Sequence, residues 1–207
     1  MEAFINRLKQ QLEQPLPGEA AQLKMAHAVR HQKKQIPADA RKAGVLALFY
    51  EKNAEPYLVL TKRVATHAQD KHSGQMSFPG GQYEPADADM SQTALRETEE
   101  EIGIPRSKIQ LLGNLTPLYI PVSNFQVYPA VGFLNQAPTF IPQDTEVQAI
   151  VETPLSLLQD AATRQTMDLR IQPALTLKRV PYYNIYQNVV WGATAMILSE
   201  LLEVIDR

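Results

Sequence analysis

The stretch from Gly80 to Ile104 reads GGQYEPADADMSQTALRETEEEIGI, and the interpretation of the whole chain depends on it. Two glycines come first, and signals for a helix follow them. Asp89 and Gln92 are three residues apart, as in a capping box, which predicts the start of a helix. Gly103 followed by Pro105 predicts its end. The stretch therefore predicts a glycine turn that leads into one short helix.

Four glutamates lie within five positions of this helix. At about 100° per residue, Glu97, Glu100 and Glu101 share one sector of roughly 100°, and Glu99 points away from them. Like charges three or four residues apart repel by roughly 0.2 to 0.5 kcal/mol per pair, so the trio gains little unless a cation lies among it. Carboxylate oxygens suit Mg²⁺ or Mn²⁺. The alternative is a solvated acidic helix, which is the usual meaning of a charge run.

The segment RETEEEIGI at 96–104 resembles the Nudix hydrolase box, G(x)5E(x)7REUxEExGU with U an aliphatic residue. The resemblance implies an α/β (α+β) fold, an αβα sandwich with a mixed central sheet. It also implies metal-assisted hydrolysis of a diphosphate. Glu97, Glu100 and Glu101 would then be catalytic and would hold Mg²⁺ or Mn²⁺ together with the Gly81 carbonyl. Arg96 would orient these acids.

The segment departs from the general box in two places. Thr98 stands where an aliphatic residue is expected, and the interval from Gly81 to Arg96 is one residue longer. Counting forward from Gly81 places Asp87 at the first acidic position. In the family a glutamate there pairs with the box arginine, so Asp87 and Glu84 are the two candidates for that role.

The preceding residues, LTKRVATHAQDKHSGQMSFPGG at 60–81, are similar to the signature of the coenzyme A diphosphatase branch of the family. That branch has an LTxR strand end, a basic residue and SFPGG before the box, and it tolerates the extra residue in the interval. The resemblance implies hydrolysis of coenzyme A and its thioesters to 3′,5′-ADP and 4′-phosphopantetheine or its acyl derivative. The residues expected to contact this substrate are Arg63, Lys71, His72, Gly80 and Gly81.

The sequence also admits other functions. The same chemistry on another nucleoside diphosphate derivative, such as ADP-ribose or NADH, is the first alternative. A Nudix fold retired from catalysis and used as a nucleotide-binding module is the second, although the three metal glutamates are retained. The interpretation as a calcium-binding structural domain has less support, because the EF-hand ligand spacing is missing.

Composition limits the remaining classes. With 207 residues and 44% hydrophobic content, the chain is expected to form one Nudix domain over residues 41–207, with a helical extension over 1–40 packed on it. A formal charge of −2 gives no field to attract nucleic acid. Without cysteine, and without an apolar run near the roughly 18 residues that span a bilayer, we expect a cytoplasmic protein with no membrane contact. The expected partner is a small nucleotide. Many relatives are dimeric, so the resemblance admits a homodimer, but the sequence does not decide the oligomeric state.

The periodicity of apolar residues predicts the remaining elements. Helices are predicted at 2–14, 154–159 and 191–205, and strands at 43–50, 57–61, 109–118, 127–134, 147–151, 175–180 and 182–190.

Overall fold

Strand β1 (Arg41–Lys52) is the centre of the fold, because both of its faces are buried. Successive side chains of a strand point to opposite faces of a sheet. Ala47 and Phe49 belong to one hydrophobic cluster, and Leu46 and Leu48 belong to another. Strand β1 therefore lies between two cores, and the sheet is covered on both faces, as the sequence predicts.

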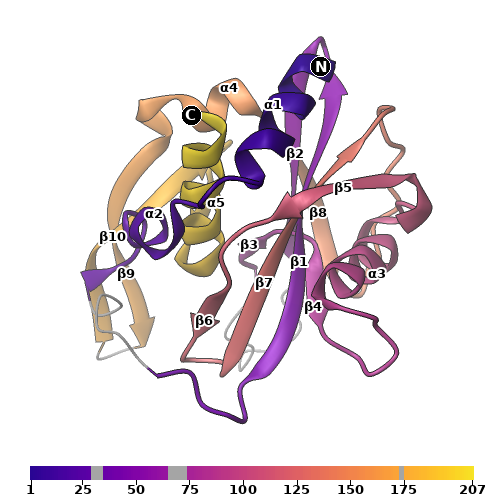
Figure 1. Ribbon diagram of the computed structural model, residues 1–207. Coiled ribbons are helices and arrows are strands. Elements are labelled where there is room, and N and C mark those ends of the chain that lie inside the picture. Colours follow the sequence, from indigo (N-terminus) through magenta and orange to yellow (C-terminus); the bar gives the residue numbers. More distant parts are fainter. Residues whose placement is uncertain (29–34, 65–73, 173–174) are drawn as a thin grey trace.

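Figure 1 shows the computed structural model of the chain, which describes residues 1–28, 35–64, 74–172 and 175–207. The helices are α1 (Glu2–Leu12), α2 (Gly18–Leu23), α3 (Met90–Ile102), α4 (Leu155–Gln159) and α5 (Gly192–Ile205), with short 3₁₀ turns at Arg106–Lys108 and Ala161–Thr163. The other strands are β2 (Glu55–Arg63), β3 (Met76–Ser77), β4 (Gly80–Gln82), β5 (Ile109–Asn114), β6 (Leu118–Ile120), β7 (Phe125–Leu134), β8 (Val147–Pro154), β9 (Arg164–Gln172), β10 (Leu175–Ile185) and β11 (Asn188–Trp191).

The larger sheet is mixed and has eight strands, with the order β3-β2-β1-β7-β5 along its main path. Strands β4, β6 and β8 add to β1, β7 and β2 respectively. Strands β1 and β7 run parallel, with Arg41 opposite Phe125 and Tyr50 opposite Leu134. The described pairs of the other strands in this sheet are antiparallel. The predicted mixed central sheet is thus confirmed.

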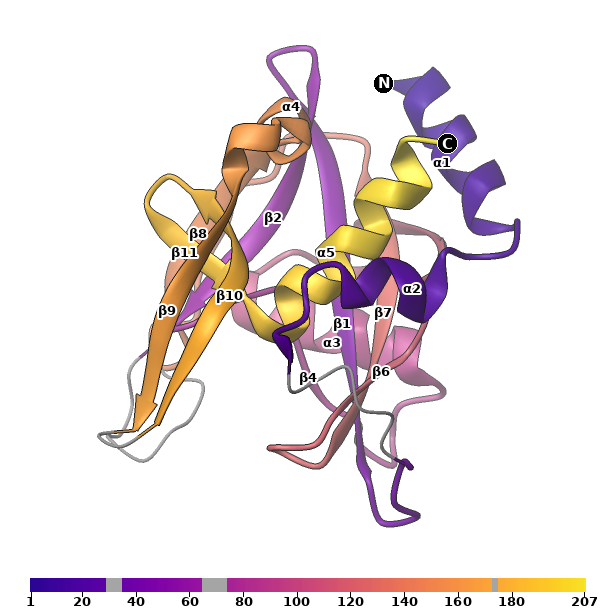
Figure 2. The same ribbon diagram turned by 90° about the vertical axis from the view of Figure 1, so that its left-hand side faces the viewer.

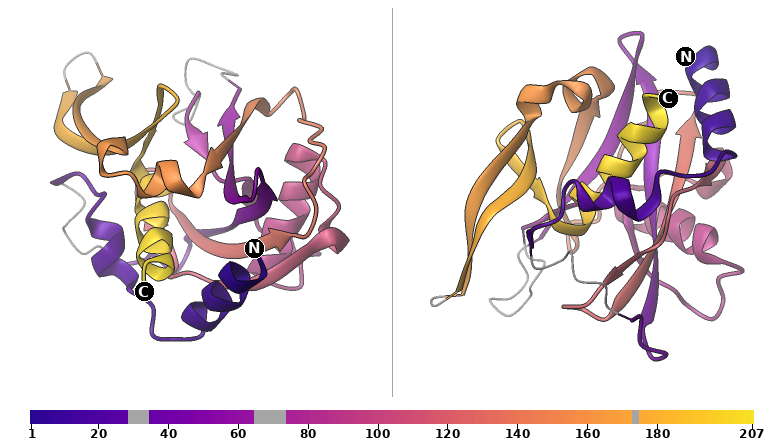
Figure 3. Two further views of the ribbon diagram at one scale, coloured as in Figure 1. Left: turned by 90° about the horizontal axis from the view of Figure 1, so that it is seen from above. Right: turned by 60° about the vertical axis from the view of Figure 1, so that its left-hand side comes forward.

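Helices lie on both faces of this sheet. Helix α3 packs on one face through Ala94, Leu95 and Ile102, which share a core with Leu46 and Leu48. Helices α1 and α5 lie on the opposite face, as the view from above in Figure 3 shows. The result is a three-layer arrangement of helix, sheet and helix.

The second sheet differs from the sequence prediction. It has three strands in the order β11-β10-β9, and Figure 2 shows α5 between it and the larger sheet. The sequence predicts separate strands at 175–180 and 182–190. The predicted break between them is wrong, because β10 continues through Pro181. Pro181 lies opposite Thr166 of β9, and a register shift precedes it between Leu177 and Val180, where Arg179 has a φ of +51°. The prediction also missed β9, although Met167, Leu169 and Ile171 alternate with polar residues.

The predicted strand 109–118 is divided in two by a buried carboxylate. Strand β5 ends at Asn114, and the backbone N–H and hydroxyl of Thr116 donate to Glu200 Oε1 at 3.2 and 2.6 Å instead of joining a strand. Glu200 also accepts hydrogen bonds from the Gly18 N–H and the Gln22 side chain. This one residue of α5 therefore anchors both α2 and the link between β5 and β6.

No helix in the described part of the chain is long and apolar enough to cross a membrane.

The hairpin between β1 and β2 provides a test of the backbone conformation. Lys52 pairs with Glu55, and the two turn residues, Asn53 and Ala54, have φ values of +54° and +59°. Both positions of such a turn favour glycine or asparagine, so we expect Ala54→Gly to stabilise the protein by about 0.5 to 1 kcal/mol. Urea unfolding would measure this. The matched control, Ala86→Gly, concerns an exposed alanine without a positive φ and should be neutral or destabilising. A lower stability of Ala54→Gly would contradict the assigned turn.

Candidate functional site

Helix α3 is held at both ends and against β1. The Asp89 carboxylate accepts a hydrogen bond from the Gln92 N–H at 2.9 Å, which confirms the predicted N-cap. Gly103 ends the helix with a φ of +72°. Gly44 of β1 faces the helix so closely that an added Cβ would lie 2.2 Å from the Met90 carbonyl oxygen. The acidic residues of α3 therefore project from a rigid element.

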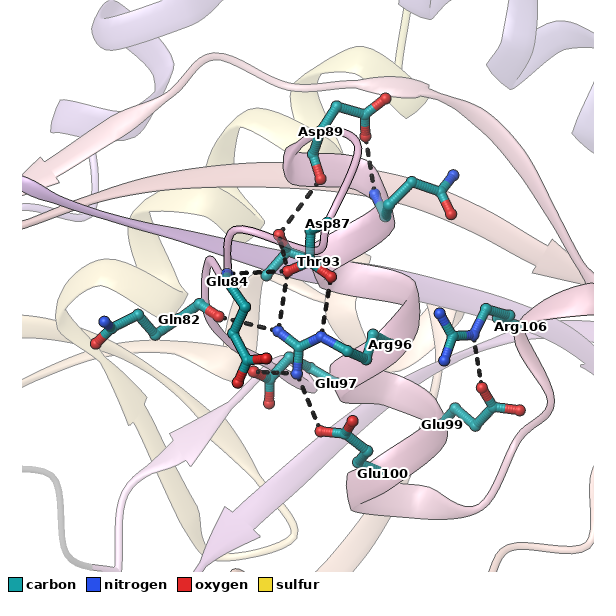
Figure 4. A network of polar contacts seen from close by, with 11 residues as sticks. Gln82, Glu84, Asp87, Asp89, Thr93, Arg96, Glu97, Glu99, Glu100 and Arg106 are labelled. Carbon is teal, nitrogen blue, oxygen red and sulfur yellow. Dashed lines mark hydrogen bonds and ion pairs between the residues drawn. The ribbon is translucent and has the colours of Figure 1, made fainter.

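The first acidic position of the motif is filled by Asp87, not Glu84. Arg96 donates from Nε to Asp87 Oδ1 and from Nη2 to Asp87 Oδ2, both at 3.0 Å, as Figure 4 shows. Asp87 also accepts from the Thr93 hydroxyl at 2.9 Å and from the Glu84 N–H at 3.1 Å. The hydrogen bonds from Arg96 hold the pKa of the Asp87 carboxyl well below its usual range. Glu84 contributes its backbone, and its side chain is exposed.

The remaining N–H groups of Arg96 join the glycine turn to the acids of α3. Nη2 donates to the Gln82 carbonyl at 3.0 Å. Nη1 donates to Glu97 Oε1 at 3.0 Å and to Glu100 Oε2 at 3.1 Å. With the two bonds to Asp87, all five donors of the guanidinium are used. The hydrogen bonds and charges of Asp87, and then of Glu97, raise the pKa of Arg96. The expected role of Arg96 in orienting the acids agrees with these contacts.

Glu101 is the most buried acid of the helix. Its side chain is 3% exposed, its Oε2 accepts from the Gly80 N–H at 3.2 Å, and Arg63 Nη1 lies 3.6 Å from its Oε1. Burial raises the pKa of Glu101 to about 7, and the charges of Glu97 and Glu146 act in the same direction. Arg63 and the Gly80 N–H oppose this rise only in part. The carboxylate is thus left with less compensating charge than its burial requires.

Glu97 lies beside the second glycine of the turn. Its side chain is 15% exposed, and a Cβ added to Gly81 would lie 2.4 Å from its Cδ. Burial raises the pKa of Glu97, Arg96 lowers it, and the charges of Glu100 and Glu146 raise it further. Glu100 is more open, with a side chain that is 53% exposed. The structure therefore brings Gly80, Gly81, Glu97 and Glu101 together, with Glu100 at the edge.

Glu99 lies apart from this group, as the helical wheel predicts. It forms a separate, partly exposed ion pair with Arg106 at 2.7 Å.

A fourth acid reaches the site from the loop before β8. The Ile141 N–H donates to the Ile102 carbonyl at 3.0 Å, and the Gln143 N–H donates to the Glu101 carbonyl at 2.9 Å. The loop is thereby fixed to the last turn of α3, and its final residue, Glu146, raises the pKa of both Glu97 and Glu101. Glu146 is exposed. Its position directly before a strand admits a catalytic base, as in some branches of the family, but the sequence favours a plain solvent-exposed glutamate.

The donor chemistry of this cluster fits a hard divalent cation. As the side chains stand, no three His, Cys, Asp or Glu residues in the described ranges are gathered closely enough to hold a metal ion. In this arrangement Arg96 donates to one oxygen each of Glu97 and Glu100, and Arg63 lies beside Glu101. Glu97 and Glu101 are nevertheless poorly solvated, and the charges of these two acids repel each other, which a cation would relieve. Of the other predicted contacts, Lys71 and His72 lie outside the described residues.

Comparison with known proteins agrees with this geometry. A family model described as the NUDIX domain matches residues 40–168. An uncharacterized Nudix hydrolase, NudL, from Pectobacterium atrosepticum is 40% identical over 153 residues, which cover 73% of this chain and 77% of the relative. A relative of the same name from Yersinia pestis is 34% identical over 204 residues, which cover 98% of this chain and 94% of the relative.

The crystal structure of a NUDIX hydrolase from Alicyclobacillus acidocaldarius shares the fold, with a TM-score of 0.50 and 16% identity over 80% of this chain and 92% of that chain. The family match covers more than half of the chain, and relatives above 30% identity align over most of its length. Together with the acidic helix, its arginine and the glycine turn, these matches establish that the chain belongs to the Nudix family of hydrolases.

Proposed function

We propose that the protein catalyses the metal-dependent hydrolysis of the diphosphate bond of coenzyme A and its thioesters. The products would be 3′,5′-ADP and 4′-phosphopantetheine or its acyl derivative. The observation that carries the hydrolytic part is the buried, undercompensated Glu101 beside Glu97 and the glycine turn. The choice of coenzyme A depends on the similarity of residues 60–81 to the coenzyme A diphosphatase branch.

In this proposal Glu97, Glu100, Glu101 and the Gly81 carbonyl hold Mg²⁺ or Mn²⁺. When bound, such an ion polarises a phosphoryl oxygen and lowers the pKa of a bound water, so that hydroxide is available near neutral pH. The chain supplies the rest. Arg96, fixed by Asp87 and Gln82, keeps Glu97 and Glu100 oriented towards the turn.

The proton of the attacking water needs an acceptor close to the acids of α3. Glu101 and Glu146 are the two candidates. Glu101 lies against the glycine turn, the charge of Glu146 raises the pKa of Glu97 and Glu101, and neither carboxylate is held by Arg96. Arg63, Lys71, His72 and the backbone of Gly80 and Gly81 are proposed to contact the substrate. A guanidinium such as that of Arg63 can bind a phosphate through two hydrogen bonds.

A substrate panel tests this function. The protein would be incubated with Mg²⁺ or Mn²⁺ and with coenzyme A, acetyl-coenzyme A, dephospho-coenzyme A, ADP-ribose or NADH. We expect the highest kcat/KM for coenzyme A and its thioester, and a lower value for dephospho-coenzyme A, which lacks the 3′-phosphate. Efficient cleavage of ADP-ribose without cleavage of coenzyme A would overturn the choice of substrate. Nucleotide binding without any cleavage would indicate a retired binding module.

The two glycines of the turn should respond differently to the same substitution. At Gly81 a new methyl group would meet the end of the flexible Glu97 side chain, so Gly81→Ala should fold normally. The displaced carboxylate should lower kcat by about tenfold to a hundredfold, because displacements near 1 Å have such effects.

At Gly80 the new Cβ would lie 2.3 Å from the Gly44 carbonyl oxygen, and φ is +149°. The clash is with backbone, so Gly80→Ala should lower the free energy of unfolding by about 2 kcal/mol or more. Melting temperatures and initial rates of both variants check the pair of predictions. A fully active Gly81→Ala would remove the proposed role of the Gly81–Glu97 contact.

A further inference from the structure

Two arginines contact the proposed metal ligands of α3, and they are held very differently. Arg96 uses all five of its donors, and its side chain is 13% exposed. Arg63 approaches Glu101 at 3.6 Å, which is longer than a hydrogen bond, and its side chain is 35% exposed. Arg96 is therefore a fixed part of the site, whereas the Arg63 contact is loose and open to water.

The backbone around Arg63 is fixed, so that only its side chain is free to turn. Arg63 is the last residue of β2, and its N–H donates to the Gln75 carbonyl at 3.0 Å. The next N–H, that of Val64, donates to the Glu146 carbonyl at 2.9 Å. The guanidinium thus extends from a rigid strand end towards the acidic cluster, on a long side chain with many rotamers.

Within the described residues, Arg63 provides the one cationic contact of Glu101. Glu101 is almost fully buried, and the contacts of its carboxylate are the Gly80 N–H and the Arg63 guanidinium, as far as the described residues extend. A buried carboxylate needs a nearby positive charge. A divalent cation at Glu101 would supply that charge and would repel Arg63 from the same position.

We propose that Arg63 is an exchangeable counter-ion, which neutralises Glu101 until a divalent cation binds there and then turns to the phosphate of the substrate. This inference rests on the proposed function, because it takes Glu101 as a metal ligand. It adds that metal binding frees the group that recognises the anion. Metal and anion therefore favour each other's binding through Arg63, in addition to any direct contact between them.

Binding of Mn²⁺ alone to the full chain, measured by isothermal titration calorimetry, tests the exchange. In Arg63→Gln the competing cation is gone, so Mn²⁺ should bind at least about fivefold more tightly than in the wild-type protein. Arg63→Lys keeps the charge and should stay within about twofold of the wild type. Lys62→Gln removes the same charge from the preceding residue, which in the described part of the chain forms no ion pair with the acids of α3, and should also change the affinity by less than about twofold.

Binding of 3′,5′-ADP, with and without Mn²⁺, supplies the second arm. Without metal, the wild type and Arg63→Gln should bind this nucleotide with similar affinity, since Arg63 is still held by Glu101. With Mn²⁺ the variant should bind it about fivefold or more weakly, because a charged hydrogen bond to phosphate contributes about 1 kcal/mol or more.

The outcomes separate this inference from the proposed function. If Glu101→Gln loses Mn²⁺ affinity but Arg63→Gln shows no gain, the metal assignment stands and the exchange is overturned. If Glu101→Gln binds Mn²⁺ as tightly as the wild type, Glu101 is not a ligand and both fail. An equal loss of 3′,5′-ADP affinity with and without metal would also overturn the exchange.

Discussion

Replacing Glu101 by glutamine is expected to lower kcat by about 10²- to 10⁴-fold at saturating Mg²⁺, because loss of a metal-bound carboxylate removes several kcal/mol of transition-state stabilisation. The fold should persist, since the amide has nearly the same shape and its oxygen can still accept from the Gly80 N–H. Initial rates with coenzyme A and the far-UV circular dichroism spectrum give the two readouts. The matched control, Glu99→Gln, changes an acid of the same helix that pairs with Arg106 outside the site, and should retain most activity. Near-normal rates for Glu101→Gln would contradict the assignment of the metal.

The raised pKa of Glu101 adds a prediction about stability. An acid whose pKa is about 7 in the folded protein and 4.5 when unfolded binds its proton more tightly in the folded state. Its contribution to stability is therefore present below pH 4.5 and is lost as the pH rises through about 7. Without divalent metal, Glu101→Gln should become more stable relative to the wild type between pH 5 and pH 8. Urea unfolding in EDTA at several pH values measures this. If the unfolding free energy of Glu101→Gln minus that of the wild type fell with rising pH, the prediction would be wrong.

The second large effect is expected at Asp87. Arg96 is largely buried and forms two of its five hydrogen bonds with this carboxylate, whose side chain is 5% exposed. Asp87→Asn would leave a buried guanidinium without its main counter-ion, which should lower the free energy of unfolding by about 2 to 4 kcal/mol. Turnover should fall as well, because Arg96 holds Glu97 and Glu100. Thermal and urea unfolding, together with initial rates, check this prediction.

Glu84→Gln is the matched control for Asp87→Asn. Glu84 is exposed and enters the network through its backbone N–H, so the substitution should change stability by less than about 0.5 kcal/mol. If Glu84→Gln were the more damaging of the two, then Glu84 would be the partner of Arg96 in solution and the assignment of Asp87 would be wrong.

The sequence predicts α3 well because the signals for this helix are local. Asp89 and Gly103 cap α3 as the residue types require, and the 3.6-residue period separates Glu99 from Glu101. The choice between Asp87 and Glu84 could not be made from the chain, because it depends on how the turn before the helix folds back on Arg96. The effect of Glu146 on the acids of α3 could not be predicted from the chain either, because it depends on hydrogen bonds between the loop before β8 and the end of α3.

The larger errors come from contacts between distant residues. Thr116 leaves the predicted strand because Glu200, 84 residues later, accepts its hydrogen bonds. Strand β10 passes through Pro181 because this residue still lies opposite Thr166 of β9, a pairing that the local sequence does not show. The boundary between the predicted helical extension, residues 1–40, and the predicted Nudix domain, residues 41–207, stays a prediction. Helices α1 and α2 are joined to the core by Leu8, Leu12 and the contacts of Glu200.

Identification of the products formed from coenzyme A by mass spectrometry, with Mn²⁺ and with EDTA, tests the central claim most directly. We expect 3′,5′-ADP and 4′-phosphopantetheine in equal amounts with Mn²⁺, neither in EDTA, and at most a small fraction of both with Glu101→Gln. Release of inorganic phosphate in place of these two products, or equal cleavage in EDTA, would contradict a metal-dependent attack on the diphosphate bond.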